Sequence, residues 1–294
     1  MEYTLVNNFL TVKISNHGAE IQSIVDNHTH TEYIWQADPK IWKRHAPVLF
    51  PIVGSLKDNQ YIYDGKIYNM TQHGFARDMD FEVESQTKDS ITFLLKDTPE
   101  TLKKYPFKFE LRVKYTLTDN LVEEKFVVTN QDEKEMIFGI GGHPAFNLKT
   151  SDSIDKSDYY FEFEPSKEHI RIPLKAPLLD WSQRSLSKTN SLIKISDLLF
   201  KDDAWVLELR GENKVSVRTD KSNYHVDVKM DAPYVGLWSQ YPQTADYVCI
   251  EPWWGIADIL ETNGHLEDKR GMNHLPAGKT WENSFSMAFY DKID

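Results

Sequence analysis

The sequence is poor in cysteine and in positive charge. Cys249 is the single cysteine among 294 residues, which excludes an internal disulfide and any metal site built from several cysteines. The chain carries 34 Lys and Arg against 45 Asp and Glu, a net charge of −11. Non-specific binding to nucleic acid or to anionic lipid depends on basic patches. We therefore expect neither a nucleic-acid partner nor a membrane partner.

Long apolar runs are missing as well. No stretch approaches the roughly 20 apolar residues that a transmembrane helix needs. Residues 1–6 have neither the basic region nor the long apolar segment of a signal peptide. We expect a cytoplasmic protein, and nothing in the sequence indicates an oligomeric state.

Aromatic residues are abundant by contrast, with 8 Trp, 14 Tyr and 15 Phe. Alternation of apolar and polar residues dominates the chain. From Phe107 to Leu117 every odd position is apolar and every even position is polar, as in a strand with one face on a core and the other in water. Helical signals are few, the best being Pro99–Lys104. Many short strands with so little helix predict an all-β sandwich or barrel, and the absence of a linker predicts one domain over residues 1–294.

A run of glycines precedes one histidine. Three glycines fall within the four positions 139–142, directly before His143 and Pro144. Because glycine loses the most backbone freedom on folding, this run fits a backbone that turns tightly or approaches another group closely. A rigidly held imidazole, with a pKa of about 6.5, is suited to giving and taking a proton near neutral pH. A histidine that is hydrogen-bonded in the core explains this segment, taken alone, equally well.

Glu251 lies between an apolar run and Pro252, with Trp253 and Trp254 after it. Since proline does not continue a central strand, we expect the carboxylate at a strand end beside aromatic rings. A partly dry, aromatic setting raises the pKa of a carboxyl group, which suits a general base. For an isolated glutamate, a surface position at a strand exit is the simpler interpretation.

A third segment, Gln72-His73-Gly74-Phe75-Ala76-Arg77, is also polar without alternation. Gln72 and His73 offer hydrogen-bonding edges. Arg77 offers a planar fork for a hydroxyl, carboxylate or phosphate group. A polar turn between strands explains this segment equally well.

The three segments together suggest a sugar site. A sugar ring has apolar faces that lie on aromatic rings, and hydroxyls that need directional polar partners. The sequence has no phosphate-cradling glycine loop ahead of a helix, no nucleophile elbow and no zinc-protease helix. The aromatic residues that lie within or beside the polar segments are candidates for the walls of a sugar pocket: Phe75, Phe146, Trp238, Trp253 and Trp254.

In their order along the chain these motifs resemble the aldose 1-epimerase (galactose mutarotase-like) family, and most of all its LacX-type branch. The matching motifs are Gln72 to Arg77, Gly141-Gly142-His143-Pro144-Ala145-Phe146 and Ile250-Glu251-Pro252-Trp253. The resemblance covers nearly the whole chain. It implies a large antiparallel β-sandwich whose concave face holds a small sugar, and neither a metal nor an organic cofactor.

The resemblance also implies roles for residues. His143 would be the general acid at the pyranose ring oxygen, and Glu251 the general base at the anomeric hydroxyl. The ring opens to the aldehyde, rotates and closes as the other anomer. His73 would bind the sugar and polarise the ring oxygen. The hydroxyl-binding aspartate falls at Asp203, with Asp202 as the alternative, and cations near the sugar would be Arg77 and Arg44, the latter with Lys43 as the alternative.

Two positions depart from the galactose mutarotases. An arginine of that family is replaced in Ile52-Val53-Gly54-Ser55, which offers only Ser55, and a glutamine near the sugar falls at Gly236. Both departures concern galactose specificity and leave the acid–base pair intact.

Three further functions fit the same residues. Arg77 resembles an arginine that hexose-6-phosphate mutarotases use toward phosphate, so a phosphorylated hexose is an alternative substrate. A non-catalytic sugar-binding or sensor module would need the same polar and aromatic side chains. A glycosidase would use Glu251 and Asp203 as its carboxylate pair.

Overall fold

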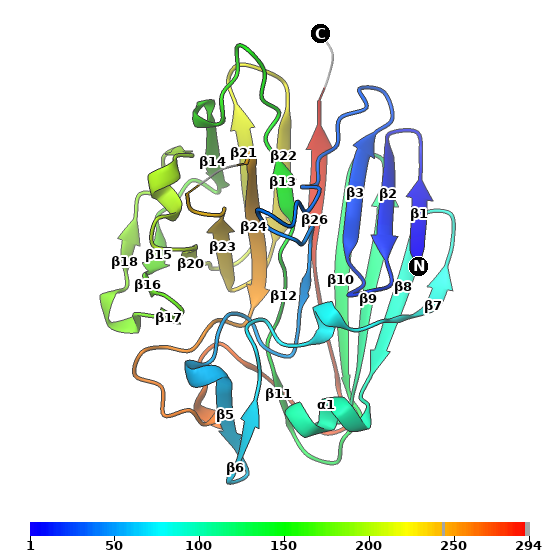
Figure 1. The fold of residues 1–294 in the computed structure, drawn as a ribbon, viewed down its shortest axis with the longest axis vertical. Coiled ribbons are helices and arrows are strands. Elements are labelled where there is room, and N and C mark those ends of the chain that lie inside the picture. Colours follow the sequence, from blue (N-terminus) through cyan, green and yellow to red (C-terminus); the bar gives the residue numbers. More distant parts are fainter. Residues whose placement is uncertain (243–244, 292–294) are drawn as a thin grey trace.

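Two large antiparallel sheets make up most of the molecule. The structure, a computed structural model, describes residues 1–242 and 245–291. The larger sheet has nine strands (Figure 1), in the order β19 (Ile193–Lys194), β14 (Tyr159–Glu164), β21 (Asn213–Thr219), β22 (His225–Met230), β26 (Thr280–Tyr290), β10 (Leu121–Asn130), β9 (Phe109–Thr118), β8 (Ser90–Lys96) and β7 (Glu82–Gln86).

The second sheet has eight strands and faces the first. Its order is β18 (Ser185–Ser187), β15 (His169–Ile172), β20 (Trp205–Glu208), β23 (Tyr234–Trp238), β24 (Tyr247–Trp254), β12 (Ile140–Gly142) and β4 (Val48–Leu49), with β13 (Ala145–Asn147) also paired to β24. The arrangement is a sandwich of two antiparallel sheets, without closure into a barrel among the described strands. The expected all-β sandwich is confirmed.

Smaller elements surround the two sheets. Short sheets are formed by β1 (Glu2–Val6), β2 (Leu10–Ser15) and β3 (Ile21–Asp26), by β5 (Gln60–Tyr63) and β6 (Lys66–Asn69), by β11 (Met136–Phe138) and β25 (Asn273–Leu275), and by β16 (Leu174–Lys175) and β17 (Leu178–Leu179). Six 3₁₀ turns are described: η1 (Lys57–Asn59), η2 (Ala76–Asp78), η3 (Lys156–Asp158), η4 (Trp181–Gln183), η5 (Asp197–Phe200) and η6 (Leu266–Asp268).

One α-helix is described, α1 (Pro99–Lys104), with the predicted bounds. The Thr98 side chain accepts the backbone N–H of Thr101 at its start, and Pro99 occupies its first position, both favourable helix beginnings. No helix of the described residues is long and apolar enough to cross a membrane.

The alternation of the sequence explains how the nine-stranded sheet packs. In β9 every odd residue from Phe109 to Leu117 is buried, while the even residues are exposed or half-buried. β10 pairs with β9 in register, with Phe126 opposite Val113, and alternates in the same way. Each of these strands therefore contributes one apolar face to the main core.

Strand β24 differs, because all eight of its residues are buried. Val248, Ile250 and Trp254 face the main core. The alternate residues, Cys249 and Glu251 among them, point to the other face of the strand. β24 therefore separates the main core from the polar site that lies on that other face.

The expectation that Glu251 lies at a strand end is wrong. Glu251 is in the middle of β24, which continues through Pro252 to Trp254. The pairing of β24 on one side is interrupted between Cys249, opposite β13, and Trp253, opposite β12. Because the neighbouring chain leaves the ladder there, a residue without an N–H is accommodated inside a central strand.

Candidate active site

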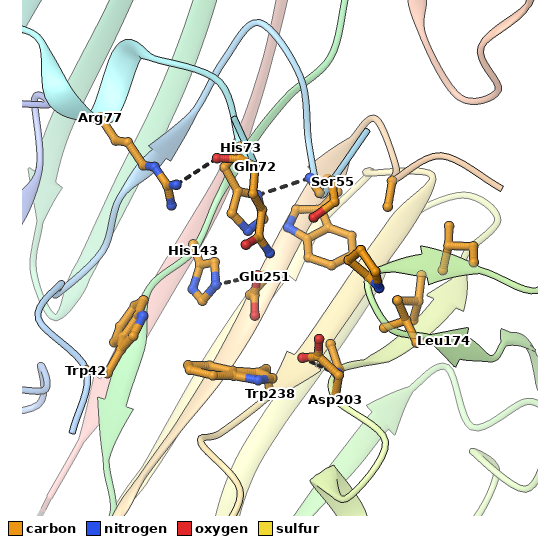
Figure 2. A pocket seen from close by; sticks show the side chains of 17 residues that line it. Trp42, Ser55, Gln72, His73, Arg77, His143, Leu174, Asp203, Trp238 and Glu251 are labelled. Atoms are coloured by element: carbon orange, nitrogen blue, oxygen red, sulfur yellow. Dashed lines mark hydrogen bonds and ion pairs between the residues drawn. The ribbon is translucent and has the colours of Figure 1, made fainter. Parts of the chain in front are cut away.

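A cavity of about 280 Å³ lies on the outer face of β24. Residues from eight separate parts of the chain line it (Figure 2). The residues that line it are Trp42, Gly54, Ser55, Gln72, His73, Arg77, His143, Leu174, Pro177, Leu179, Asp203, Ala204, Val206, Trp238, Glu251, Trp253 and Ala257. All of the predicted site residues except Arg44 are among them.

His143 and Glu251 form the centre of the site. The His143 Nε2 lies 3.0 Å from a carboxylate oxygen of Glu251, and both side chains are buried. His143 lies in the short connection between β12 and β13, which both pair with β24. The two strands therefore hold the imidazole directly beside the Glu251 side chain.

The glycines before His143 allow neighbouring side chains to pack closely against the backbone of β12. A Cβ atom on Gly141 would lie 2.8 Å from the Trp253 side chain, and one on Gly142 would lie 2.6 Å from Phe285. Real Cβ atoms do not come this close to other groups, so a larger residue would displace β12 from β24 or from the core. Of the two uses expected for the glycine run, close approach is the one observed.

Burial shifts the pKa values of the two groups in opposite directions. Desolvation, with a smaller effect of the Asp203 charge, raises the pKa of Glu251 well above its usual range. Desolvation, with the charges of Arg77 and Arg44, lowers the pKa of His143 to about 3. Removing either group from water disfavours its charged form. The pair therefore holds one proton across the neutral range, and burial favours the arrangement with Glu251 protonated and His143 neutral.

His73 lies beside this pair with a defined tautomer. Its ring packs edge-on against the ring of His143, with centroids 5.6 Å apart. Its Nδ1 accepts the backbone N–H of Gly54 at 3.0 Å, which places the ring proton of the neutral form on Nε2. Burial, with the neighbouring positive groups, lowers the pKa of His73 well below its usual value. His73 is therefore a neutral hydrogen-bond donor toward the cavity.

Two residues other than glycine that line the cavity have left-handed backbones. His73 has a φ of 66° and Asp203 a φ of 76°. This region is uncommon for residues other than glycine and costs free energy. Such strain is found more often at functional sites than elsewhere, and here it affects two predicted sugar-binding residues.

Asp203 rather than Asp202 lines the cavity, and Asp202 is exposed. One oxygen of the Asp203 carboxylate accepts the N–H of Ala204 at 2.9 Å. Burial raises the pKa of Asp203, while its bonds with Ala204 and the Trp238 side chain oppose that shift. Of the two aspartates that the sequence left open, Asp203 is therefore the one that reaches the cavity.

The two predicted arginines are placed differently. Arg77 lines the cavity, and its guanidinium donates to the carbonyl of Gln72 at 2.6 Å. Its Nε is buried and has no hydrogen-bond partner among the described residues. Arg44 does not line the cavity and pairs with Asp78 at 2.8 Å. Its charge still acts on His143.

The aromatic walls are only partly those expected. Trp238 and Trp253 line the cavity, whereas the other three candidates, Phe75, Phe146 and Trp254, belong to the main core. Trp42 was missed. Its ring stacks on His143 with centroids 5.0 Å apart and meets Trp238 edge-on at 5.4 Å. No local pattern around Trp42 marks it, because its partners lie far away in sequence.

Gly236 has a structural explanation. A Cβ atom at this position would lie 2.5 Å from the ring of Trp253. The Trp253 indole therefore fills the space next to Gly236, and a glutamine would not fit there without moving it. An aromatic ring therefore lies where the resemblance implied a glutamine.

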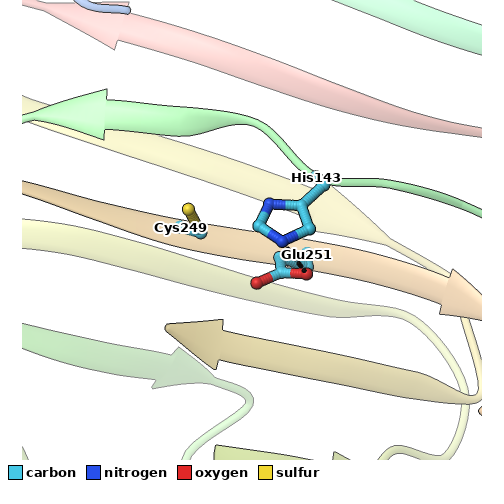
Figure 3. A group of neighbouring side chains, drawn as sticks. All are labelled: His143, Cys249 and Glu251. Carbon is cyan, nitrogen blue, oxygen red and sulfur yellow. Dashed lines mark ion pairs between the residues drawn. The ribbon is translucent and has the colours of Figure 1, made fainter. Parts of the chain in front are cut away.

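His143, Glu251 and Cys249 form a compact group of possible metal ligands, with ligand atoms within 4.8 Å of one another (Figure 3). A cysteine binds a metal as its thiolate. Burial and the charge of Glu251 raise the pKa of Cys249 well above its usual value, and the thiol packs against Ala145 and Tyr247. The donor set therefore fits a metal poorly.

The chain is similar to known proteins in both sequence and structure. The aldose 1-epimerase family matches residues 1–288. The chromosomal protein LacX of Lactococcus lactis subsp. lactis is 36% identical over 280 residues, which are 92% of this chain and 93% of LacX. The crystal structure of a galactose mutarotase related enzyme from Lactobacillus acidophilus is 59% identical and superposes with a TM-score of 0.98 over the whole of both chains. A galactose mutarotase-like protein from Lactobacillus casei ATCC 334 is 30% identical, with a TM-score of 0.90 over 98% of this chain and 100% of that one.

Proposed function

Because the chain belongs to the aldose 1-epimerase family, we propose that it interconverts the α and β anomers of an aldohexose. The observation that carries the proposal is the contact of 3.0 Å between His143 and Glu251, two buried side chains that line the cavity. The ring oxygen and the anomeric oxygen of a pyranose are bonded to the same carbon. An acid for one and a base for the other must therefore lie side by side, as these two groups do.

The proposed ring opening begins with His143 protonated and Glu251 ionised. His143 gives its proton to the ring oxygen while Glu251 takes the proton of the anomeric hydroxyl. The bond between the ring oxygen and the anomeric carbon breaks, and the anomeric C–O bond becomes the aldehyde. Rotation about the neighbouring C–C bond exposes the other face, and the reverse transfers close the ring.

Charge explains why the pair suits this cycle. Ring opening converts an ionised pair into a neutral one, with the proton on Glu251. Burial favours that neutral arrangement, as the directions of the two pKa shifts indicate. Ring closure recreates the ionised pair, and because the proton only moves between the two groups and the sugar, no exchange with water is needed.

The remaining polar groups would bind the sugar. We expect the Nε2–H of His73 to donate to a sugar oxygen and the Asp203 carboxylate to accept from a hydroxyl, because both residues line the cavity and His73 Nδ1 is occupied by the N–H of Gly54. Trp42 and Trp238 meet at 5.4 Å and offer aromatic surface to the apolar parts of the ring. These groups hold the anomeric carbon against the pair, which is the positioning that catalysis requires.

One observation favours a phosphorylated hexose as the alternative substrate. Arg77 lines the cavity, and its Nε has no hydrogen-bond partner among the described residues. A guanidinium with a donor that makes no hydrogen bond suits a phosphate group, which would compete with the Asp78 carboxylate 3.9 Å from Nε. The net charge of −11 weighs against an anionic ligand.

Anomerisation of free and 6-phosphorylated hexoses, followed by polarimetry or NMR, tests the proposal. We expect interconversion faster than in buffer alone and no release of sugar from an aryl glycoside. If phosphate is recognised, Arg77→Ala will lower kcat/KM for phosphorylated hexoses and leave free hexoses nearly unchanged. Arg112→Ala, on the outer face of β9 and bonded to Glu84, is a matched control for loss of an arginine. Sugar binding without any interconversion would instead identify a non-catalytic sugar-binding protein.

A further inference from the structure

A buried ion pair lies behind one wall of the cavity. The Lys269 ammonium donates to a carboxylate oxygen of Asp258 at 2.9 Å and to the carbonyl of Ile256 at 2.7 Å. The side chains of Lys269 and Asp258 are only 3% and 4% exposed. Neither residue lines the cavity, and neither has a part in the proposed proton transfers.

Asp258 connects this pair to the segment 54–57. Its second carboxylate oxygen accepts the backbone N–H of Lys57 at 2.9 Å. Its own N–H donates to the carbonyl of Ser55 at 2.8 Å. The segment is thus held at two points by one aspartate, and its Gly54 packs so closely on Ala257 that a Cβ atom would lie 2.5 Å from the Ala257 Cβ.

The same segment determines the orientation of His73. The N–H of Gly54 donates to His73 Nδ1 at 3.0 Å, and the N–H of His73 donates to the carbonyl of Gly54 at 2.9 Å. The first of these bonds requires an unprotonated Nδ1, so it selects the tautomer with the proton on Nε2. A continuous chain of hydrogen bonds therefore runs from Lys269 through Asp258 and segment 54–57 to the His73 ring.

A buried ion pair is expensive to keep for stability alone. The cost of removing two charges from water offsets most of their attraction, and well-packed apolar residues are often at least as stabilising. Here the carboxylate does what an apolar side chain would not, because its two oxygens hold Lys269 on one side and the Lys57 N–H on the other. The arrangement fits a requirement for exact backbone placement beside a functional side chain.

We propose that Asp258 and Lys269 are positioning residues for the site, which hold segment 54–57 in place and thereby keep His73 as the Nε2–H tautomer, a hydrogen-bond donor to the sugar. The inference rests on the proposed function for the role of that donor. The tautomer itself can be read without any activity.

The first test is the tautomer. Histidine labelled with ¹⁵N distinguishes the two ring nitrogens in long-range ¹H–¹⁵N spectra, and His73→Gln identifies the signals of His73 by their loss. We expect one tautomer, Nε2–H, in the wild type. In Asp258→Asn the amide oxygen accepts from only one of the two former donors, so we expect Nδ1–H to become populated. Lys269→Met, if it folds, should give the same change, and Lys149→Met, which unpairs the buried Asp291 elsewhere, should not.

The second test is kinetic. Displacement of a positioned group lowers rates by up to about 100-fold, so we expect Asp258→Asn to lower kcat/KM for anomerisation by about 10- to 100-fold. If Asp258 acts through His73, the same substitution in a His73→Ala background should change the rate by less than about threefold, because the two effects are not independent.

Two results would overturn the inference. One is an unchanged Nε2–H tautomer in Asp258→Asn; the other is a loss of rate of the same size with and without His73. Failure of the proposed function looks different. The wild type would then not anomerise sugars at all, while the tautomer of His73 would still respond to Asp258→Asn.

Discussion

The shared proton of His143 and Glu251 predicts an unusual pH profile. Raising the pH from about 6.5 to about 8.5 deprotonates an ordinary imidazole. Burial lowers the pKa of His143 to about 3 and raises the pKa of Glu251 well above its usual range. Between about pH 3 and the raised pKa of Glu251 the pair carries one proton, which the contact of 3.0 Å allows the two groups to share. The fraction of enzyme with the reactive arrangement of that proton therefore stays constant, and we predict a flat profile of kcat/KM over this range.

Two independent groups would behave differently. A histidine with a pKa of about 6.5 is half protonated at about pH 6.5 and about 1% protonated at about pH 8.5. An enzyme that needs such a histidine as its acid would lose about 50-fold in kcat/KM between these values. The shared proton therefore predicts no change in kcat/KM between these pH values, whereas independent groups predict a change of more than one order of magnitude.

The assay is α/β interconversion at a series of pH values, followed by NMR on a freshly dissolved single anomer. The rate without protein is subtracted at each pH, because acids and bases of the buffer also open the ring. A decline in kcat/KM of about tenfold per pH unit above about 6.5 would refute the shared proton. It would mean that His143 titrates as an isolated group despite its burial.

Three further outcomes are expected. Glu124 is buried in β10 beside the Tyr115 side chain, and burial raises its pKa to about 8 from a usual 4.5, although the Tyr115 hydroxyl opposes that shift. The contribution of this raised pKa to the free energy of unfolding is complete below the pKa of the unfolded state, and it is lost as the pH rises to the pKa of the folded state. Glu124→Gln should therefore gain stability over the wild type by about 1.4 kcal/mol per pH unit in that window, toward an upper bound of about 5 kcal/mol. The free energy of unfolding in urea, measured at several pH values with Glu123→Gln as the control, tests this. A difference between Glu124→Gln and the wild type that does not change with pH would contradict it. The added methyl group of Gly236→Ala should overpack against Trp253. We expect the free energy of unfolding to fall by about 1–3 kcal/mol and KM to rise. An unchanged free energy of unfolding together with an unchanged KM would refute the close contact. Trp42→Ala should remove the ring that stacks on His143 and raise KM. The control is Trp281→Ala, because the Trp281 ring packs on Phe138 and Trp254, and its effect on KM should be several-fold smaller. Equal effects on KM would argue against Trp42 as a wall of the sugar site.

The regular parts of the fold were predictable because their causes are local. The alternation of apolar and polar residues in β9 and β10 predicts which side chains face the core. Pro99 and the residues beside it set the start of α1. His143 and Glu251 were found because glycines and prolines interrupt the strand pattern beside them. In each case the signal lies within a few residues of the feature.

The features that were missed depend on partners far away in the sequence. Glu251 lies within β24 because the chain opposite leaves the ladder between β12 and β13, and nothing near Glu251 indicates this. Trp42 meets His143 only in the folded molecule. The tautomer of His73 depends on Gly54, and the position of Gly54 depends in turn on Asp258.

The most direct test of the central claim is the exchange between the α and β anomers at equilibrium, measured by NMR for the wild type, Glu251→Gln and His143→Ala. Glu251→Gln keeps the shape of the side chain and removes the base, so binding of the sugar, measured by calorimetry, should persist. We predict that each substitution lowers the exchange rate by about 10²- to 10⁴-fold, the usual contribution of a general acid or base. Exchange at the wild-type rate in both variants would contradict the assignment of this pair as the acid and base.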